Sequence, residues 1–199
     1  MCGFAGIVGP GIVVSDQQIS SALRALARRG PDSRGIYRDE LSMIVHARLR
    51  IIDLNPASDQ PFKLSSGRGA VIAFNGEIYN YRDLRRELEG EDRAFVTNSD
   101  TEVFLAGFER WGERVFQRVK GMFAVALWEP KKRSLTLARD PLGKKPLFFM
   151  QDAGRIVFGS NLSALTPLLE STPRVSRDAL ETFLGLLCVP QETSIFEGV

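Results

Sequence analysis

The sequence opens with MCGFAGIV at residues 1–8, a run of small and apolar residues behind one cysteine. The run predicts a buried strand over residues 4–8, with Cys2 directly before it. Without Met1, Cys2 would carry a thiol and a free α-amine, and an amine that titrates at about 7.7 to 8.0 can accept the thiol proton. The stretch therefore suggests an N-terminal nucleophile. Taken alone, a cysteine here is more often a small residue that packs in a core.

The composition limits what the rest of the chain can be. The 199 residues are 44% hydrophobic and 25% charged, which fits one large globular domain and excludes disorder. A net charge of +2 is too small to indicate a nucleic-acid partner, and no apolar run approaches the roughly 20 residues that cross a bilayer. Cys2 and Cys188 form no C-x-x-C pair, which argues against a disulfide framework or a zinc site and favours a reducing, cytoplasmic location.

Capping and turn signals divide the chain into strands and short helices. A capping box at Ser15 predicts a helix over residues 16–28, and caps at Asn80, Ser99 and Ser176 predict helices over 81–89, over 100–111 and from 177 on. Strands are predicted at 4–8, 12–14, 35–37, 43–47, 50–54, 70–74, 122–128, 134–138, 146–150 and 155–159. We expect an N-terminal hairpin over 4–14 and an antiparallel meander from the last four strands. The pattern predicts a layered α+β domain.

Three other places carry polar side chains that suit chemistry. Asn75-Gly76 after an apolar strand is either a type I′ hairpin turn or an oxyanion hole, whose donors each lower a barrier by about 3 kcal/mol. Arg48 is either a solvated strand residue or a fork for a carboxylate. Asp100 either favours the start of its helix or holds a substrate ammonium. Taken one at a time, the structural alternative is the more common.

Together, these residues belong to a set of short blocks that occur in one order across almost the whole chain. The blocks are MCGFAGI (1–7), RGPD (29–32), HARLRIID (46–53), QP (60–61), NGEIYN (75–80), SDTE (99–102), GMFA (121–124) and RDPLG (139–143). They resemble the class II glutamine amidotransferase domain of the asparagine synthetase family. The glucosamine-phosphate synthase and amidophosphoribosyltransferase domains share the Cys2 start but resemble the blocks at 29 and 75 less. The resemblance implies a four-layer αββα Ntn-hydrolase sandwich of two antiparallel sheets between helical layers.

The resemblance also implies a reaction. Cys2, freed by removal of Met1, would attack the side-chain amide of glutamine. Asn75 and Gly76 would stabilise the oxyanion, ammonia would leave, and water would release glutamate from the thioester. His46, the single histidine, is expected to be structural, because an N-terminal cysteine brings its own base.

Substrate binding would fall to a second group of residues. By the resemblance, Arg48 would hold the α-carboxylate of glutamine, and Asp100 with Glu77 its α-ammonium. The backbone around Leu49 and Ile51 would line the same pocket. The chemistry agrees, since a zwitterion needs a fixed cation and a fixed anion. Cys188, at the end of the last helix, is expected to pack as an inert small hydrophobe.

Residues 1–199 are expected to form one type 2 glutamine amidotransferase domain. In the family, an ATP-dependent synthetase domain with a Ser-Gly-Gly-x-Asp-Ser loop follows, receives the ammonia and amidates a carboxylate, with aspartate as the first expectation. That loop is absent from this sequence, so the synthetase domain, with its ATP and Mg²⁺, is expected outside the chain. No cofactor is expected for the glutaminase step. Glutamine and the synthetase domain are the expected partners, a homodimer is allowed, and neither nucleic acid nor a membrane is expected.

Three alternatives stay open. The acceptor could be another carboxylate, such as a sugar acid. The domain could be an Ntn hydrolase for a different amide, such as an acylase, although Arg48 together with Asp100 argues against a substrate without a zwitterionic end. It could also be a non-catalytic domain, which retention of Met1 would favour because it blocks the amine of Cys2.

Overall fold

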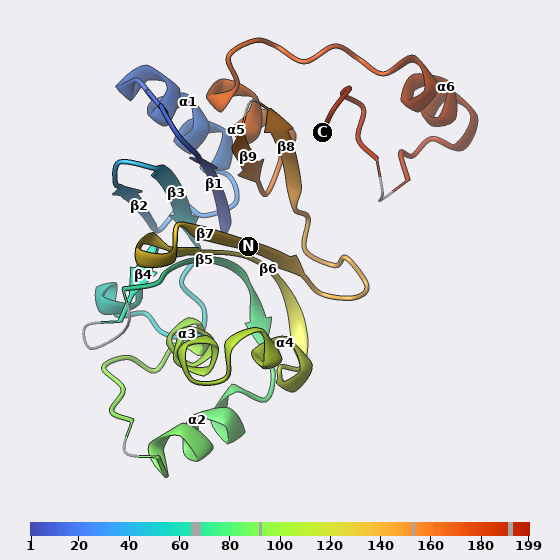
Figure 1. Cartoon of the computed structure of the whole chain (residues 1–199). Coiled ribbons are helices and arrows are strands. Elements are labelled where there is room, and N and C mark those ends of the chain that lie inside the picture. Colours follow the sequence, from blue (N-terminus) through green and yellow to red (C-terminus); the bar gives the residue numbers. More distant parts are fainter. Residues whose placement is uncertain (65–68, 92, 153, 191–192) are drawn as a thin grey trace.

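Two antiparallel sheets face each other, and helices cover their outer faces (Figure 1). The computed structural model describes residues 1–64, 69–91, 93–152, 154–190 and 193–199. Helices α1 (Asp16–Leu26) and α5 (Leu162–Leu165) pack on one sheet, and α2 (Tyr81–Glu89), α3 (Asp100–Trp111) and α4 (Val115–Arg118) lie on the side of the other. The predicted αββα arrangement is confirmed.

The first sheet has the N-terminal strand at its centre. Its order is β2 (Ser33–Arg38), β3 (Ser42–Arg48), β1 (Gly3–Val8), β9 (Arg155–Gly159) and β8 (Phe148–Asp152). In β1, Phe4 pairs with His46 of β3, and Ala5 pairs with Gly159 of β9. Both edges of β1 are therefore occupied, and Cys2 sits just outside the start of this fixed strand.

The second sheet is built on one long ladder. Its order is β4 (Phe62–Lys63), β5 (Val71–Ile78), β6 (Gly121–Glu129) and β7 (Ser134–Arg139). The β5–β6 pairing includes Asn75 opposite Ala124 and Gly76 opposite Phe123. Asn75-Gly76 is thus inside a strand and forms no hairpin turn.

Three of the four predicted caps are confirmed. The helices are α1 (Asp16–Leu26), α2 (Tyr81–Glu89), α3 (Asp100–Trp111), α4 (Val115–Arg118), α5 (Leu162–Leu165) and α6 (Arg177–Leu186), with short 3₁₀ turns at Pro56–Ser58, Gly112–Arg114, Pro130–Lys132 and Thr166–Leu168. Ser15 forms a complete capping box, and Ser99 and Ser176 accept from backbone N–H groups of their first turns. Asn80 precedes α2, but its side chain makes no cap hydrogen bond: Nδ2 donates to Arg118 O, and Oδ1 accepts from Lys120 N.

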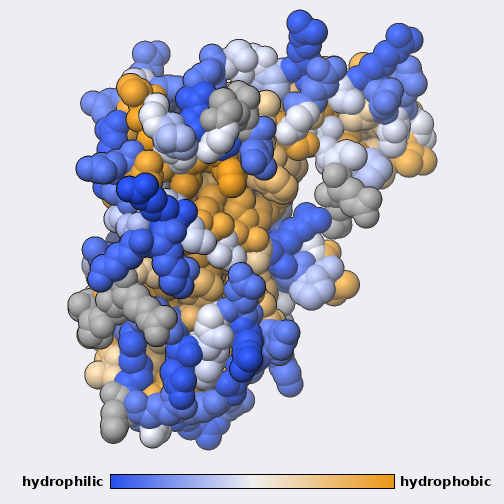
Figure 2. Space-filling view, in the orientation of Figure 1, coloured by the Kyte–Doolittle hydropathy of each residue, from blue (hydrophilic) through white to orange (hydrophobic). Residues whose placement is uncertain are grey.

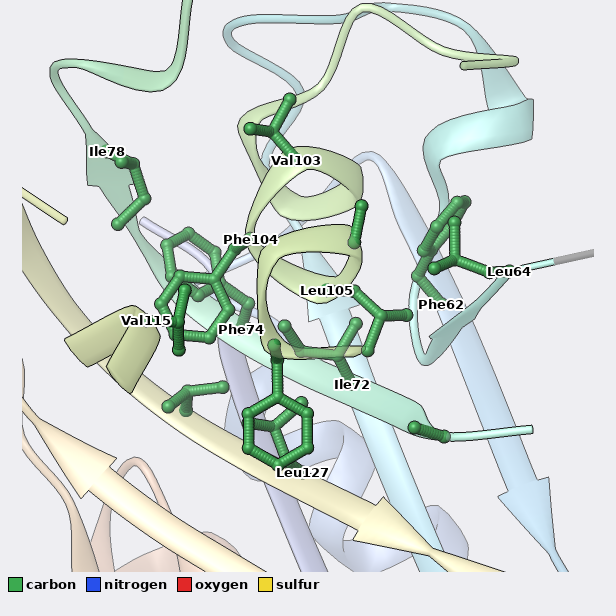
Figure 3. Close-up of a cluster of buried hydrophobic side chains, with 14 of the residues drawn as sticks. Phe62, Leu64, Ile72, Phe74, Ile78, Val103, Phe104, Leu105, Val115 and Leu127 are labelled. Carbon is green, nitrogen blue, oxygen red and sulfur yellow. The ribbon is translucent and has the colours of Figure 1, made fainter. Parts of the chain in front are cut away.

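Three layers of buried side chains hold the sandwich together. Between the sheets lie Phe4 and Phe158, while Ala5 and Ile7 of the same β1 strand face α1, as the period of two in a strand requires. The layer between α3 and the second sheet is aromatic and aliphatic, and Figure 3 shows Phe104 and Leu105 of α3 among its members. Among the described residues, no helix is long and apolar enough to cross a bilayer.

Two of the predicted strands are absent. Residues 12–14 cannot pair with β1, because β3 and β9 already occupy both of its edges. Residues 50–54 form no strand: Arg50 N donates to the Asp32 side chain and Asp53 O accepts from Arg48 Nη2, so both groups are bonded outside a sheet. The expected meander is also wrong, since β6–β7 lies in one sheet and β8–β9 in the other.

Candidate functional site

One pocket, with a cavity volume of about 140 Å³, brings all the predicted site residues together. The start of β1, the end of β3 and the loop after it, the middle of β5 and the first turn of α3 meet there. The predicted residues that line it are Cys2, Arg48, Leu49, Ile51, Asn75, Gly76, Glu77 and Asp100. Residues almost 100 positions apart in the sequence thus share one small polar space.

The thiol of Cys2 is held by the backbone of a single residue, Leu49. Sγ accepts from Leu49 N at 3.4 Å and can donate to Leu49 O at 3.6 Å. Burial raises the pKa of Cys2, while the Leu49 hydrogen bond and the positive charges of the chain terminus and Arg48 act in the opposite direction. Its reactivity therefore depends on the charges around the pocket.

Asn75 and Arg29 grip the backbone of Cys2. With the Asn75 amide oriented so that donors face acceptors, Nδ2 donates to Cys2 O at 2.9 Å and Oδ1 accepts from Arg29 Nη2 at 3.2 Å. Arg29 Nε also donates to Cys2 O, at 3.0 Å. One N–H of the Asn75 amide stays available for a ligand. The sequence predicts no individual role for Arg29, and its place in the RGPD block was the only signal.

Gly76 is required by the close approach of the neighbouring strand. A Cβ at this position would lie 2.4 Å from Met122 O and 2.7 Å from the Phe123 backbone. Any side chain would push β5 and β6 apart beside Asn75. The glycine therefore fixes where this part of β5 lies relative to Cys2.

Arg48 is a buried cation, and only part of its guanidinium is hydrogen-bonded within the protein. Nη1 donates to Asn55 O at 3.1 Å and to Asp59 at 2.6 Å, and Nη2 donates to Asp53 O at 2.5 Å. Among the described residues these are its only hydrogen bonds, so Nε–H and one hydrogen of Nη2 have no protein partner. Free N–H groups on a buried guanidinium suit a carboxylate ligand.

Two carboxylates supply the opposite charge. Asp100, at the start of α3, is buried and accepts from Ile78 N at 2.9 Å. Burial raises the pKa of Asp100 to about 6, and the neighbouring charge of Glu77 adds to the rise. Both residues line the pocket. A cation bound between them would relieve this unfavourable pair of charges.

A glutamine amidotransferase domain profile matches residues 1–199, the whole chain. The chain belongs to the glutamine amidotransferase domain family. The predicted family membership is confirmed, and curated relatives support the asparagine synthetase branch. The domain is 33% identical over 204 residues to asparagine synthetase [glutamine-hydrolyzing] 3 of Bacillus subtilis, covering 100% of this chain and 33% of that protein.

Other relatives agree. A putative asparagine synthetase [glutamine-hydrolyzing] of Mycobacterium tuberculosis is 37% identical over 218 residues, covering 100% of this chain and 33% of that protein. Asparagine synthetase B [glutamine-hydrolyzing] of Escherichia coli is 39% identical over 146 residues, covering 73% of this chain and 26% of that protein. The amidotransferase domain thus spans about a third of the length of the curated relatives it matches.

Solved structures support the fold of the amidotransferase domain. Glutamine phosphoribosylpyrophosphate amidotransferase from B. subtilis superimposes with a TM-score of 0.69 at 22% identity, over 84% of this chain and 43% of that one. A structure described as the allosteric regulatory enzyme of purine biosynthesis gives 0.65 at 21% identity, over 84% and 43%. At these identities the likeness establishes the sandwich and not the chemistry.

His46 lies outside the pocket of the amidotransferase domain and bridges its two sheets. Nε2 lies 3.0 Å from Phe74 O, next to Asn75 in β5, and burial lowers the pKa of His46 to about 4. A carbonyl only accepts, so the neutral ring carries its proton on Nε2 and donates. This geometry agrees with a structural role for His46.

Cys188 differs from its prediction. It is exposed and packs in no core, because the apolar face of α6 is itself largely uncovered: Phe183 is 41% and Leu184 69% exposed. On the face shown in Figure 2, apolar surface runs over the stacked sheets and recurs on the α6 segment.

Among the described residues, no group of three or more His, Cys, Asp or Glu could hold a metal.

Proposed function

We propose that this domain hydrolyses glutamine to glutamate and ammonia, with Cys2 as nucleophile once Met1 has been removed. The observation that carries the proposal is the pocket itself. It sets the Cys2 thiol beside a buried guanidinium with free N–H groups and a pair of carboxylates. A glutamine side chain could reach Cys2 while its zwitterionic end meets both kinds of charge.

The proposed reaction begins with proton transfer within Cys2. The free α-amine takes the thiol proton, and Sγ attacks the δ-carbon of the glutamine amide. The available N–H of Asn75 and the backbone N–H of Gly76 stabilise the negative oxygen that develops. The C–N bond then breaks, the amine returns its proton to the leaving nitrogen, and ammonia departs. Water cleaves the remaining thioester and releases glutamate.

Substrate recognition follows from the charges. Arg48 would bind the α-carboxylate through Nε–H and Nη2–H, while Asp100 and Glu77 would hold the α-ammonium. Leu49 and Ile51 line the space between. An acyl amide without a zwitterionic end would leave both sets of charges unmatched, which is why we favour glutamine over a simple acyl substrate.

For the whole protein, we propose an asparagine synthetase. Relatives that bear that name match the full chain, and about two thirds of their length lies outside it. In this proposal a synthetase domain uses ATP and Mg²⁺ to activate aspartate, and the ammonia made at Cys2 completes the amide. The glutaminase step needs no cofactor, because the amine of Cys2 serves as its base. A reducing compartment such as the cytoplasm suits a free nucleophilic thiol.

The test combines an intact mass with ammonia release. We expect a mass that lacks Met1, with ammonia and glutamate formed from glutamine but nothing from butanamide, which has the amide without the charged end. Hydrolysis of butanamide with glutamine left intact would contradict the proposal. So would a chain that keeps Met1 and releases no ammonia.

A further inference from the structure

The pocket contains one buried cation that the proposed reaction does not use. Lys145 is 6% exposed and lines the same pocket as Cys2. Its Nζ lies 3.2 Å from Met1 Sδ, and it forms no ion pair with any described residue. A buried lysine is rarely left unpaired. Within the described residues its one side-chain hydrogen bond is with Met1, the residue that processing would remove.

Backbone hydrogen bonds to Asp140 fix the loop that carries Lys145. The carboxylate of Asp140 accepts from the backbone N–H of Leu142 at 3.2 Å, Lys144 at 3.0 Å, Lys145 at 3.1 Å and Phe123 at 3.2 Å. Although burial acts the other way, these bonds hold the pKa of Asp140 below its usual value. Asp140 is therefore occupied by backbone groups and not by Lys145 Nζ. The adjacent Lys144 is exposed, so two neighbouring lysines of this loop lie in opposite environments.

The other charges around Cys2 show what this cation can balance. The negative groups of the pocket come from three elements: Glu77 from β5, Asp100 from α3, and Asp53 from the loop after β3. Two other cations lie near Cys2. Arg48 from β3 lines the pocket and is already paired with Asp59, and Arg29 after α1 bonds the Cys2 carbonyl without being part of the pocket lining. Among the described residues that line the pocket, Lys145 is the side-chain cation with no carboxylate of its own. The negative charge of these carboxylates disfavours loss of a proton from Cys2, and the positive charge of Lys145 favours it.

We propose that Lys145 is a positioning residue for the nucleophile, a buried cation that favours loss of the first proton from the processed Cys2. Removal of Met1 frees the space that its thioether occupies against Nζ. The charge of Lys145 then acts on the new α-amine and the thiol, and both lose a proton more readily beside a cation. The inference rests on the proposed nucleophile, but its effect on the thiol can be measured without glutamine.

The first experiment measures alkylation of the two cysteines by iodoacetamide as a function of pH, with peptide masses as the readout. Cys188 is exposed and serves as the internal reference in every sample. In Lys145→Gln we expect the alkylation midpoint of Cys2 to rise by about one pH unit. In Lys145→Arg and in the matched control Lys144→Gln, the Cys2 midpoint stays at the wild-type value. Cys188 behaves identically in all four proteins.

The second experiment follows the acid limb of kcat/KM for glutamine in the same proteins. We expect it to move up by about one pH unit in Lys145→Gln, with a roughly tenfold loss at the foot of the limb, and to return in Lys145→Arg. Lys145→Met keeps the apolar stem and gives the same shift if Lys145→Gln does not fold. An unchanged Cys2 midpoint in a folded Lys145→Gln or Lys145→Met overturns the inference, as does failure of arginine to restore it. Absence of hydrolysis in wild type would overturn the proposed function instead, and the alkylation profile would still decide the role of Lys145.

Discussion

Cys2 and Cys188 place the same side chain in opposite surroundings. Cys2 lies at the start of a strand paired on both edges, with its carbonyl held by Arg29 and Asn75 and its thiol against Leu49. Cys188 follows α6, whose apolar side chains are largely exposed, and its thiol faces solvent. The difference between the two thiols is thus a fixed backbone and a set of charged groups, which Cys2 has and the exposed Cys188 lacks, and which our proposal requires of the nucleophile.

The largest expected difference between the two regions is in catalysis. Cys2→Ala should abolish ammonia release from glutamine, because Cys2 carries the only thiol among the described residues that line the pocket. Cys188→Ala should leave kcat and KM unchanged. Both rates are measured by ammonia release, with melting temperatures to show that each variant is folded. Undiminished hydrolysis by Cys2→Ala would remove the difference on which the comparison depends.

The next prediction concerns the oxyanion donor. Asn75→Ala should lower kcat about 100-fold, since one donor to the developing negative charge is lost. Asn161→Ala is the matched control: Asn161 caps α5 by accepting from Ala164 N at 2.8 Å and is not part of the pocket lining. That variant should lose about 1 kcal/mol of stability and keep its kcat. Equal kcat values in the two variants would contradict the role of Asn75 as an oxyanion donor.

Arg48 and Arg50 allow a similar contrast within one ion-pair cluster. Both bind Asp59, at 2.6 and 2.8 Å, but only Arg48 lines the pocket. Arg48→Ala should raise KM for glutamine by about tenfold or more, because a charged bidentate contact is lost. Arg50→Ala should change KM little. Steady-state kinetics on both variants checks this, and an unchanged KM in Arg48→Ala would mean that another group holds the carboxylate.

The pH dependence of glutamine binding should report Asp100. Burial raises the pKa of Asp100 to about 6, so its carboxylate is present above that pH and is lost below it. Glutamine keeps its ammonium throughout this range, so its dissociation constant should rise about tenfold between pH 7.5 and pH 5. Calorimetry on the Cys2→Ala variant measures binding without turnover. Asp100→Asn should bind more weakly and show no such rise; a flat wild-type profile would contradict the assignment.

The smallest effect is expected on α6. Leu184 is 69% exposed, so Leu184→Ala should change the free energy of unfolding by less than about 0.5 kcal/mol. Leu105 of α3 is fully buried, and Leu105→Ala should cost about 2 to 5 kcal/mol. Denaturant titration of both variants gives the comparison. A large loss in Leu184→Ala would mean that α6 is packed in solution.

Local signals in the sequence predicted much of the fold. Ser15, Ser99 and Ser176 begin the helices that their caps predict, because capping involves only neighbouring residues. The ladder partners of β1 depend on distant segments, and no local pattern shows that residues 12–14 find both edges occupied. Asn75-Gly76 teaches the same lesson: the dipeptide favours a turn, and pairing with β6 prevents it.

The sequence predicted those residues of the candidate site that lie in the blocks resembling the asparagine synthetase family. All eight predicted residues line one pocket. Lys145 was missed because its contact with Met1 spans 144 positions, and nothing in Lys144-Lys145 shows which lysine is buried. Arg29 was missed because its role depends on reaching the Cys2 carbonyl across the end of α1. Contacts of this kind follow from the tertiary structure alone.

The most direct test of the central claim is to trap the intermediate. The processed domain would be mixed with glutamine, quenched in acid during turnover and digested, and the N-terminal peptide would be weighed. We predict that this peptide gains the mass of one glutamyl group on Cys2, that hydroxylamine removes the added mass, and that the Cys188 peptide is unchanged. Steady turnover with no glutamyl group on Cys2 at any quench time, or with the group on another residue, would contradict the account.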